Sequence, residues 1–298
     1  SRLLLPSMGL YAIAVWLLCG LVTDHLWLQF ACFVISSYLM VELNNSNALI
    51  RIYSRMVSCS FIMMVCMSTF LLQSSKGMML SICVVMSFVM AFLSYQDKYS
   101  MGRIFYSFMS IGIGSMIDVS VLFFVPVMWL AMFFHLQSMT LRTFISSLFG
   151  LICPYWFVAV YLIYTNDITL AVEHFSQLAV FGKVANFSQV PVSALVSICY
   201  VTILSVVGII HYLRNRVFDK TRTRMLYNTF ILFDIFAIVY IILQPQHYIP
   251  TLIILIVTTS PLIAHFIALT HTRITNIAFK VIVAASLALT IINILQLI

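Results

Sequence analysis

The sequence predicts an all-α protein, a polytopic transmembrane helical bundle of about eleven membrane segments, and three observations predict it. Hydrophobic residues make up 63% of the chain and charged residues only 8%, whereas a soluble domain carries about 25% charged residues. Apolar runs of roughly 18–20 residues, the length of helix that crosses a bilayer core of about 30 Å, follow one another along the chain. The basic residues also concentrate on alternate loops.

The apolar segments are expected to form a single integral membrane domain over residues 1–298. They are too long and too uniformly apolar for barrel strands, and lipid offers no hydrogen-bond partner to an unpaired backbone, so helices are predicted. The first segment is too long for the core of a signal peptide and is predicted to be a span. The segments lie near residues 4–22, 26–42, 56–73, 78–95, 104–117, 119–135, 143–163, 192–212, 226–243, 250–270 and 277–297.

Lysines and arginines divide unequally between the two alternate sets of loops. One set holds 13 of them, and the other holds only Lys76 and Lys183. Short loops rich in Lys and Arg stay in the cytoplasm, so the amino terminus is predicted inside and the carboxyl terminus outside. The richer set is Arg2, Arg51, Arg55, Lys98, Arg103, Arg142, Arg214, Arg216, Lys220, Arg222, Arg224, Arg273 and Lys280.

Residues 103–134 need a break. As one helix this stretch would be about 46 Å long, more than ordinary tilt accommodates. Gly112, Gly114 and Asp118 lie near its middle and favour an interruption there. Both ends carry cytoplasmic-type charge, so the chain must go out and return, either as two short spans or as a broken, re-entrant hairpin over 104–135.

The longest loop on the outer side covers residues 165–191. Val172, Phe175, Leu178 and Ala179 share one helical face, and Glu173 and Gln177 lie on another. This pattern predicts an amphipathic helix on the outer surface of the membrane.

The most basic stretch is "RNRVFDKTRTR", residues 214–224, which is predicted to be a cytoplasmic loop. No aromatic or glycine-rich recognition pattern accompanies it, so nucleic acid is not an expected partner. Contact with anionic lipid headgroups is expected instead. Its basic residues are Arg214, Arg216, Lys220, Arg222 and Arg224.

Asp234 and His265 lie deep inside predicted spans. Charged groups there are costly and usually face a partner or a cavity. Asp234 is therefore either functional or held in a structural pair with His265, Lys280 or a neighbouring amide. His265 alone is expected to bond a backbone carbonyl.

Acids and histidines also gather on the outer side, and four of them are candidate catalytic residues: Asp24, Asp118, Glu173 and His174. Carboxylates and imidazoles beside a lipid-accessible cavity suit acid–base chemistry or a bound cation. No strict motif joins them, and polar residues that end helices in water are the alternative interpretation. Asp167, His25 and His247 lie on the same side.

Several catalytic classes are excluded by missing motifs. The chain has no P-loop, no HExxH and no GxSxG, and the "GIGSM" around Ser115 lacks the second glycine of a nucleophile elbow. The seven cysteines show no zinc-ligand spacing. No metal site is predicted, and the sequence points to no cofactor.

The stretch 103–157 resembles a family of uncharacterised polytopic inner-membrane proteins from Bacteroidota. The resemblance is carried by "RIFYSFMSIGIGSM", by the apolar run after it and by "LRTFISSLFGLICPYWF". It implies a bacterial inner, or cytoplasmic, membrane and brings no catalytic residues. A weaker resemblance links Asp24, at the outer end of the first span, to membrane glycosyltransferases that use polyprenyl-phosphate sugars. Those enzymes usually have a long first outer loop, whereas here the loop is "TDH".

Three functions follow as hypotheses. The first is an envelope-glycan enzyme that acts at the outer face on a lipid-linked sugar, with Asp24 as base or cation ligand and the outer amphipathic helix as a lid. The second is a non-catalytic subunit or scaffold with membrane-protein partners. The third is a transporter or flippase, favoured by Asp234, by His265 and by the interrupted 103–134 segment.

Overall fold

The computed structural model describes residues 4–269 and 273–297, and within these ranges it consists of helices and connecting loops, without a strand. Arg2, one of the predicted cytoplasmic residues, lies outside the described residues. The α-helices are α1 (Leu4–Leu18), α2 (Trp27–Asn47), α3 (Met56–Met67), α4 (Thr69–Gln73), α5 (Ser75–Phe92), α6 (Met101–Ile117), α7 (Val125–Phe134), α8 (Leu141–Thr165), α9 (Ile168–Ser176), α10 (Val192–Asn215), α11 (Thr221–Leu243), α12 (Tyr248–Leu269) and α13 (Arg273–Leu297). The 3₁₀ helices are η1 (Val119–Phe124), η2 (Gln177–Ala179), η3 (Phe187–Gln189), η4 (Arg216–Phe218) and η5 (Pro245–His247).

Seven helices of the described chain are long and apolar enough to cross a membrane, which supports an integral membrane protein. Three shorter apolar helices accompany them: Leu4–Leu18, Met56–Met67 and Val119–Phe134. The seven long ones are Trp27–Asn47, Ser75–Phe92, Leu141–Thr165, Val192–Phe218, Thr221–Leu243, Pro245–Leu269 and Thr275–Leu295.

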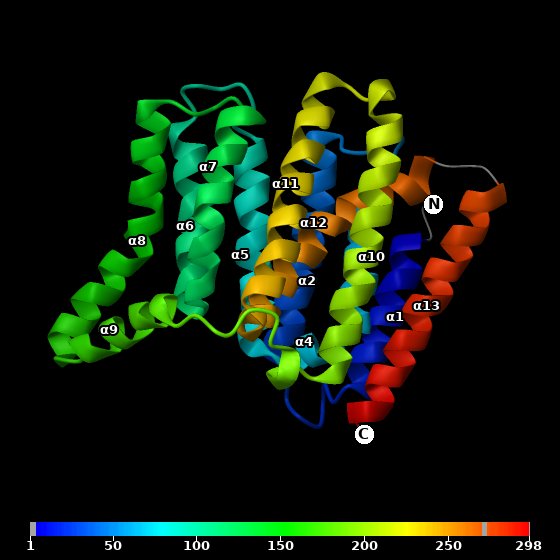
Figure 1. Ribbon diagram of the computed structural model, residues 1–298, viewed down its shortest axis with the longest axis horizontal. Coiled ribbons are helices and arrows are strands. Elements are labelled where there is room, and N and C mark those ends of the chain that lie inside the picture. The colour runs from blue at the N-terminus through cyan, green and yellow to red at the C-terminus, as the bar shows by residue number, and fades with distance from the viewer. Residues whose placement is uncertain (1–3, 270–272, 298) are drawn as a thin grey trace.

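The helices run back and forth between two ends of the bundle (Figure 1). The loops 48–55, 93–100, 135–140 and 216–220 lie together at the end drawn uppermost, here named the basic end. The turn 19–26, helices α4 and α9 and the loop 177–191 lie at the opposite end, here named the far end. These four loops, all of the richer basic set, therefore share one end of the molecule.

Residues 101–134 form two helical arms that meet at Asp118. The carboxylate of Asp118 accepts hydrogen bonds from the backbone N–H of Ser120 at 3.0 Å and from its hydroxyl at 2.5 Å. Asp118 is thus the N-cap of η1, and a cap of this kind satisfies donors that the start of a helix leaves unpaired. The predicted interruption lies at this residue.

A second break, at Ser68, divides the predicted 56–73 segment into α3 and α4. The side-chain amide of Asn293 on α13 donates to the carbonyl of Met67 at 2.6 Å. Since a carbonyl without a partner is costly in an apolar interior, this long-range bond helps to stabilise the interruption. Sequence periodicity did not predict it.

Helix α12 lies at the centre of the bundle and is buried along almost its whole length. It packs against α3, α5, α10 and α11. Helices α6 and α8 form a second close pair at one side, where two glycines allow the backbones to approach. A Cβ on Gly150 would lie 2.4 Å from the carbonyl oxygen of Phe105, and one on Gly112 would lie 2.7 Å from that of Leu151.

The second half of α8 departs from the bundle toward the far end (Figure 1). Pro154 lies inside this helix and cannot donate to the carbonyl of Gly150, which permits a bend. Helix α8 ends at Asn166, whose left-handed backbone (φ 57°) suits an αL cap. The chain then turns into α9, which lies across the far end as the predicted amphipathic helix would.

Candidate functional site

At the far end, His174 of α9 contacts the last turn of α6. Its Nε2 atom lies 2.9 Å from the carbonyl oxygen of Ser115. A carbonyl oxygen only accepts hydrogen bonds, so Nε2 carries the proton of the neutral ring and Nδ1 keeps a lone pair. His174 is thus held at one nitrogen and has its other nitrogen available as an acceptor.

The hydroxyl of Ser115 forms two hydrogen bonds of its own. It donates to the carbonyl of Gly112 at 2.7 Å, and it lies 2.7 Å from the hydroxyl of Tyr155 on α8. Because Ser115 has only one hydroxyl proton, Tyr155 is the donor to it. Ser115 is completely buried. It therefore serves to fix Tyr155, and its hydroxyl is not available as a nucleophile.

A groove of about 250 Å³ lies between the departing half of α8, helix α9 and the end of α6. Its walls are apolar except for Tyr155 and His174. The lining residues are Met116, Tyr155, Val158, Leu162, Leu170, Ala171, His174 and Phe175. The groove is the kind of site that takes an apolar chain with a polar group at one end.

The face of α9 that meets the groove differs in part from the predicted apolar face. Ala171 and His174 line the groove together with Phe175, whereas Val172 is 65% exposed. Leu178 is partly buried. Leu178 lies in η2, beyond the end of α9, and Ala179 is exposed. Of the predicted apolar face, only Phe175 therefore lines the groove.

Two of the four candidate catalytic residues lie near the C-terminal end of α6, and no hydrogen bond or ion pair between these two described residues is found. The backbone N–H of Asp118 donates to the carbonyl of Gly114, one residue before Ser115, to which His174 is bonded. His247 of η5 adds an imidazole here, with its Nδ1 atom 4.0 Å from Oδ1 of Asp118. Asp118 and His174 thus share this corner of the far end.

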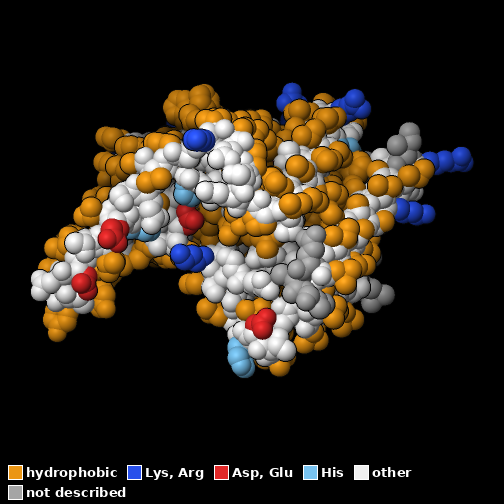
Figure 2. All heavy atoms as spheres, turned by 60° about the horizontal axis from the view of Figure 1, so that its bottom comes forward, with side chains coloured by type: hydrophobic (Ala, Val, Ile, Leu, Met, Phe, Trp, Pro, Cys, Tyr) orange, Lys and Arg blue, Asp and Glu red, His pale blue; other side chains and the backbone are white. Residues whose placement is uncertain are grey.

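In the described chain, the side chains of Asp24 and Glu173 do not join Asp118 or His174. Both side chains are exposed, and within residues 4–269 and 273–297 neither forms a side-chain hydrogen bond or ion pair with Asp118 or His174. Figure 2 shows the acids spread over this face. The described part of the chain also contains no group of three His, Cys, Asp or Glu side chains placed to hold a metal ion.

Asp234, the acid predicted inside a span, is completely buried on α11. Its partners are three hydroxyls of the neighbouring helices. Ser205 of α10 donates to Oδ2 at 2.5 Å, Thr259 of α12 donates to the same oxygen at 3.1 Å, and Thr258 bonds Oδ1. The predicted structural pairs with His265, Lys280 or an amide are wrong, because hydroxyls fill these positions.

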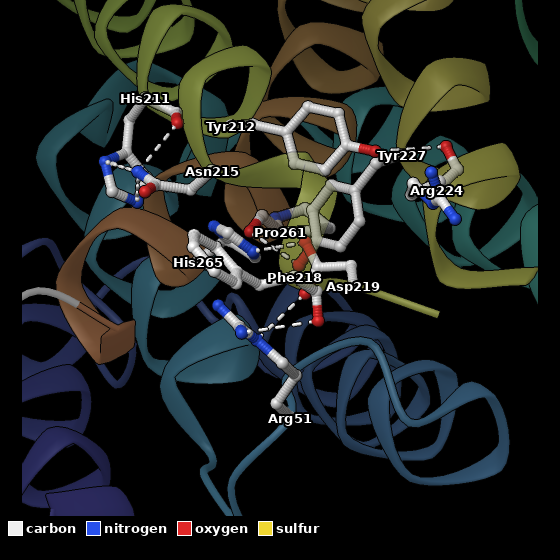
Figure 3. Close-up of polar contacts among 10 residues, drawn as sticks. All are labelled: Arg51, His211, Tyr212, Asn215, Phe218, Asp219, Arg224, Tyr227, Pro261 and His265. Carbon is white, nitrogen blue, oxygen red and sulfur yellow. Dashed lines mark hydrogen bonds and ion pairs between the residues drawn. The ribbon is translucent and has the colours of Figure 1, made fainter. Parts of the chain in front are cut away.

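His265 is also buried, but it does not bond a backbone carbonyl as expected. Its Nε2 atom lies 3.1 Å from Oδ2 of Asp219, and Arg51 completes the cluster, with Nε 3.0 Å from Oδ1 of the same carboxylate. Figure 3 shows Arg51 and His265 on two sides of Asp219. His265 bonds a carboxylate instead of the predicted backbone carbonyl because an anionic oxygen is the stronger hydrogen-bond acceptor.

Aromatic rings close this cluster from the bundle side. Tyr212 and Tyr227 stack with ring centroids 4.7 Å apart, and the ring of His265 meets Tyr227 edge-on at 5.2 Å. The Asp219 side chain is 0% exposed. A buried carboxylate needs such partners because an isolated charge in an apolar interior is strongly destabilising.

Asp219 was not identified from sequence as a functional or structural residue. The available signal was its position as the only acid within the basic stretch 214–224. Its two charged or titratable partners come from the loop 48–55 and from α12, so the cluster joins three distant parts of the chain at the basic end.

The residues of the basic stretch divide into two groups. Arg222 donates to the side chain of Asn47 at 2.9 Å and lies 5.9 Å from the ring centre of Tyr95, and Arg224 donates to Thr221 at 3.4 Å. The other basic side chains are exposed, and no hydrogen bond or ion pair to the described residues holds them. They are Arg214, Arg216 and Lys220.

Comparison with known proteins adds no identification: no family model, no curated protein and no solved structure matches this chain. The resemblances noted from sequence remain predictions, and the function rests on the geometry described above.

Proposed function

We propose that the protein is an eleven-span membrane protein whose basic end faces the cytoplasm. The seven long helices, the three shorter ones and α6 are the segments proposed to make up the eleven. The collection of arginine-rich loops at one end supports this orientation, since such loops remain on the cytoplasmic side. The exposed Arg214, Arg216 and Lys220 are then available to anionic headgroups.

On this orientation, we propose that the protein is an envelope-glycan enzyme that acts at the outer face on a lipid-linked sugar. The single observation that carries the proposal is the groove of α8 and α9, whose walls are apolar apart from His174 and Tyr155. A polyprenyl chain suits the walls, and its phosphate and sugar suit the polar end. Because α8 leaves the bundle here, we expect the groove to open toward the lipid.

His174 is the group best placed for chemistry. Its Nδ1 lone pair can accept the proton of an acceptor hydroxyl while that oxygen forms a bond to the sugar carbon. The bond between this carbon and the phosphate oxygen breaks at the same time, and the lipid phosphate leaves with the electron pair. Asp118 and His247, which pair with each other near the end of α6, lie outside the groove lining and are proposed to bind parts of the substrate that extend beyond it.

A matched pair of variants tests the groove. Ala171 lines it, whereas the next residue, Val172, is 65% exposed. Ala171→Trp is expected to fill the groove, to abolish photo-crosslinking to a diazirine-labelled polyprenyl-phosphate sugar and to change the envelope glycan profile of cells that depend on the variant. Val172→Trp is expected to preserve both. Equal crosslinking of both variants at the wild-type level would rule out this groove as the binding site.

A further inference from the structure

Asp234 and its partners form an enclosed group of oxygen atoms between α10, α11 and α12. Asp234, Ser205, Thr258 and Thr259 are each 0% exposed. The arrangement is unusual because three hydroxyls, and no cation, converge on one carboxyl group. None of these four residues lines the groove at the far end.

Pairing with a charged side chain does not explain why Asp234 is buried. In the described ranges, no Lys, Arg or His pairs with Asp234, and α7, which also packs on α11, carries no titratable residue. The titratable groups on the elements around Asp234 lie further along the helices. They are Cys199, Tyr200, His211, Tyr212 and Arg214 on α10, Arg222, Arg224, Tyr227 and Tyr240 on α11, His247 on η5, and Tyr248 and His265 on α12.

Thr258 allows the carboxyl group to exist in two states. The hydroxyl of Thr258 contacts Asp234 and also lies 2.8 Å from the carbonyl of Ile254. It has one proton, so it donates either to the carboxylate or to that carbonyl. In the second case its oxygen accepts from a protonated Asp234. Every heavy atom keeps its place in both states.

A metal ion fits this geometry poorly. The oxygens of Ser205 and Thr259 lie 2.5 and 3.1 Å from Oδ2 of Asp234, which are hydrogen-bond separations. Oxygens that share an ion at about 2.0–2.6 Å lie about 2.8–3.6 Å from each other, so an ion would have to widen the contact between Ser205 and Asp234. A proton needs no such space.

We propose that Asp234, with Ser205, Thr258 and Thr259, is a proton-binding site in the membrane-embedded core. It takes up and releases one proton, with Thr258 reversing its hydrogen bond between the two states. Because the site is enclosed between α10, α11 and α12, a proton reaches it only when these helices open transiently.

Infrared difference spectroscopy of the purified full chain during a pH titration tests this site. The wild type is expected to show the carbonyl stretch of a protonated carboxyl group that disappears as the pH rises. Asp234→Asn, which is close in shape to the protonated acid, should lack this band. Glu42→Gln, which removes an exposed carboxylate, should retain it.

A second variant and a salt control keep the test independent of folding. Ser205→Ala removes one donor to the carboxylate, so the band should persist to a higher pH than in the wild type. Replacing choline chloride by sodium chloride at constant pH should leave the band unchanged. Identical difference spectra for the wild type and Asp234→Asn, or loss of the band on adding sodium, would overturn the proposal.

Discussion

His265 and Asp219 form a buried pair at the basic end, with Nε2 3.1 Å from Oδ2. The two residues are 46 positions apart in the sequence and belong to α12 and to the loop before α11. Arg51 reaches the same carboxylate from the loop between α2 and α3. Asp219 therefore links the start of α11 to α12 and to the loop between α2 and α3 at the basic end.

Removing this carboxylate is the first prediction. Asp219→Ala leaves Arg51 and His265 without their common partner, and breaking a buried pair in this way costs about 3–5 kcal/mol. Arg51 keeps part of its hydration, since its side chain is 37% exposed, so the loss should fall toward the lower figure. Thermal unfolding of the purified protein in detergent measures it.

Asp97→Ala is the matched control for that change. Asp97 pairs with Arg103 at 3.6 Å, but the two side chains are 42% and 51% exposed. A pair of this kind contributes about 0–1 kcal/mol. Equal destabilisation by the two substitutions would contradict the structural role assigned to Asp219.

The contact between α6 and α8 gives the second prediction. A Cβ on Gly150 would lie 2.4 Å from the backbone oxygen of Phe105, which cannot move without displacing the helix. Gly150→Ala should therefore lower the unfolding free energy by about 1–3 kcal/mol, the usual cost of overpacking.

Gly102→Ala is its control, because a Cβ at Gly102 in α6 meets nothing within 4 Å. Alanine there should be neutral or stabilising by up to about 1 kcal/mol through helix propensity. Both variants can be compared by detergent unfolding. An unaltered Gly150→Ala protein would show that the two helices do not pack this closely.

The burial of His135 leads us to expect that the stability of the protein depends on pH. Burial lowers the pKa of this histidine at the basic end from its ordinary 6.5. The unfolded chain then binds more protons than the folded chain between the two pKa values, so the contribution of His135 to stability is present above about pH 6.5 and is lost as the pH falls toward the folded value.

His135→Gln should flatten the dependence of the unfolding midpoint on pH between about 7 and 5, because the variant has no group to protonate there. Unfolding curves of the wild type and the variant over that interval measure the difference. Parallel curves would show that His135 does not contribute to the pH dependence.

The proposed chemistry predicts the effect of losing His174. His174→Ala should lower glycosyl transfer about 10²–10⁴-fold, the range lost with a general base, while leaving the amount of folded protein unchanged. His25→Ala removes an exposed histidine from the same end and should retain activity. Complementation of a deletion strain, followed by analysis of envelope glycans, compares the two. Full activity of His174→Ala would eliminate His174 as the base.

Much of the helical arrangement could be predicted from the sequence, because apolar composition and loop charge act locally. The interruption at Asp118 is an example, since an acid after two glycines is a recognisable helix boundary. The break at Ser68 was not predictable in this way, because the side chain that satisfies Met67 is Asn293, far along the chain.

The candidate sites show the same division. Helix α9, which carries His174, was predicted from periodicity, but the groove depends on the bend of α8 near Pro154, which periodicity does not reveal. The partners of Asp234 and His265 were predicted incorrectly because Ser205, Thr258 and Asp219 come from other helices or loops. Such pairings are set by packing between elements and leave no local pattern.

Thiol labelling from outside intact cells tests the placement of the two ends most directly. In a variant without the seven native cysteines, single cysteines can replace Lys183 at the far end and Lys220 at the basic end. A membrane-impermeant maleimide should label Lys183→Cys in intact cells and should label Lys220→Cys only after the cells are opened. Labelling of Lys220→Cys in intact cells, with Lys183→Cys protected, would reverse the orientation and remove the basis for an outward-facing site at His174.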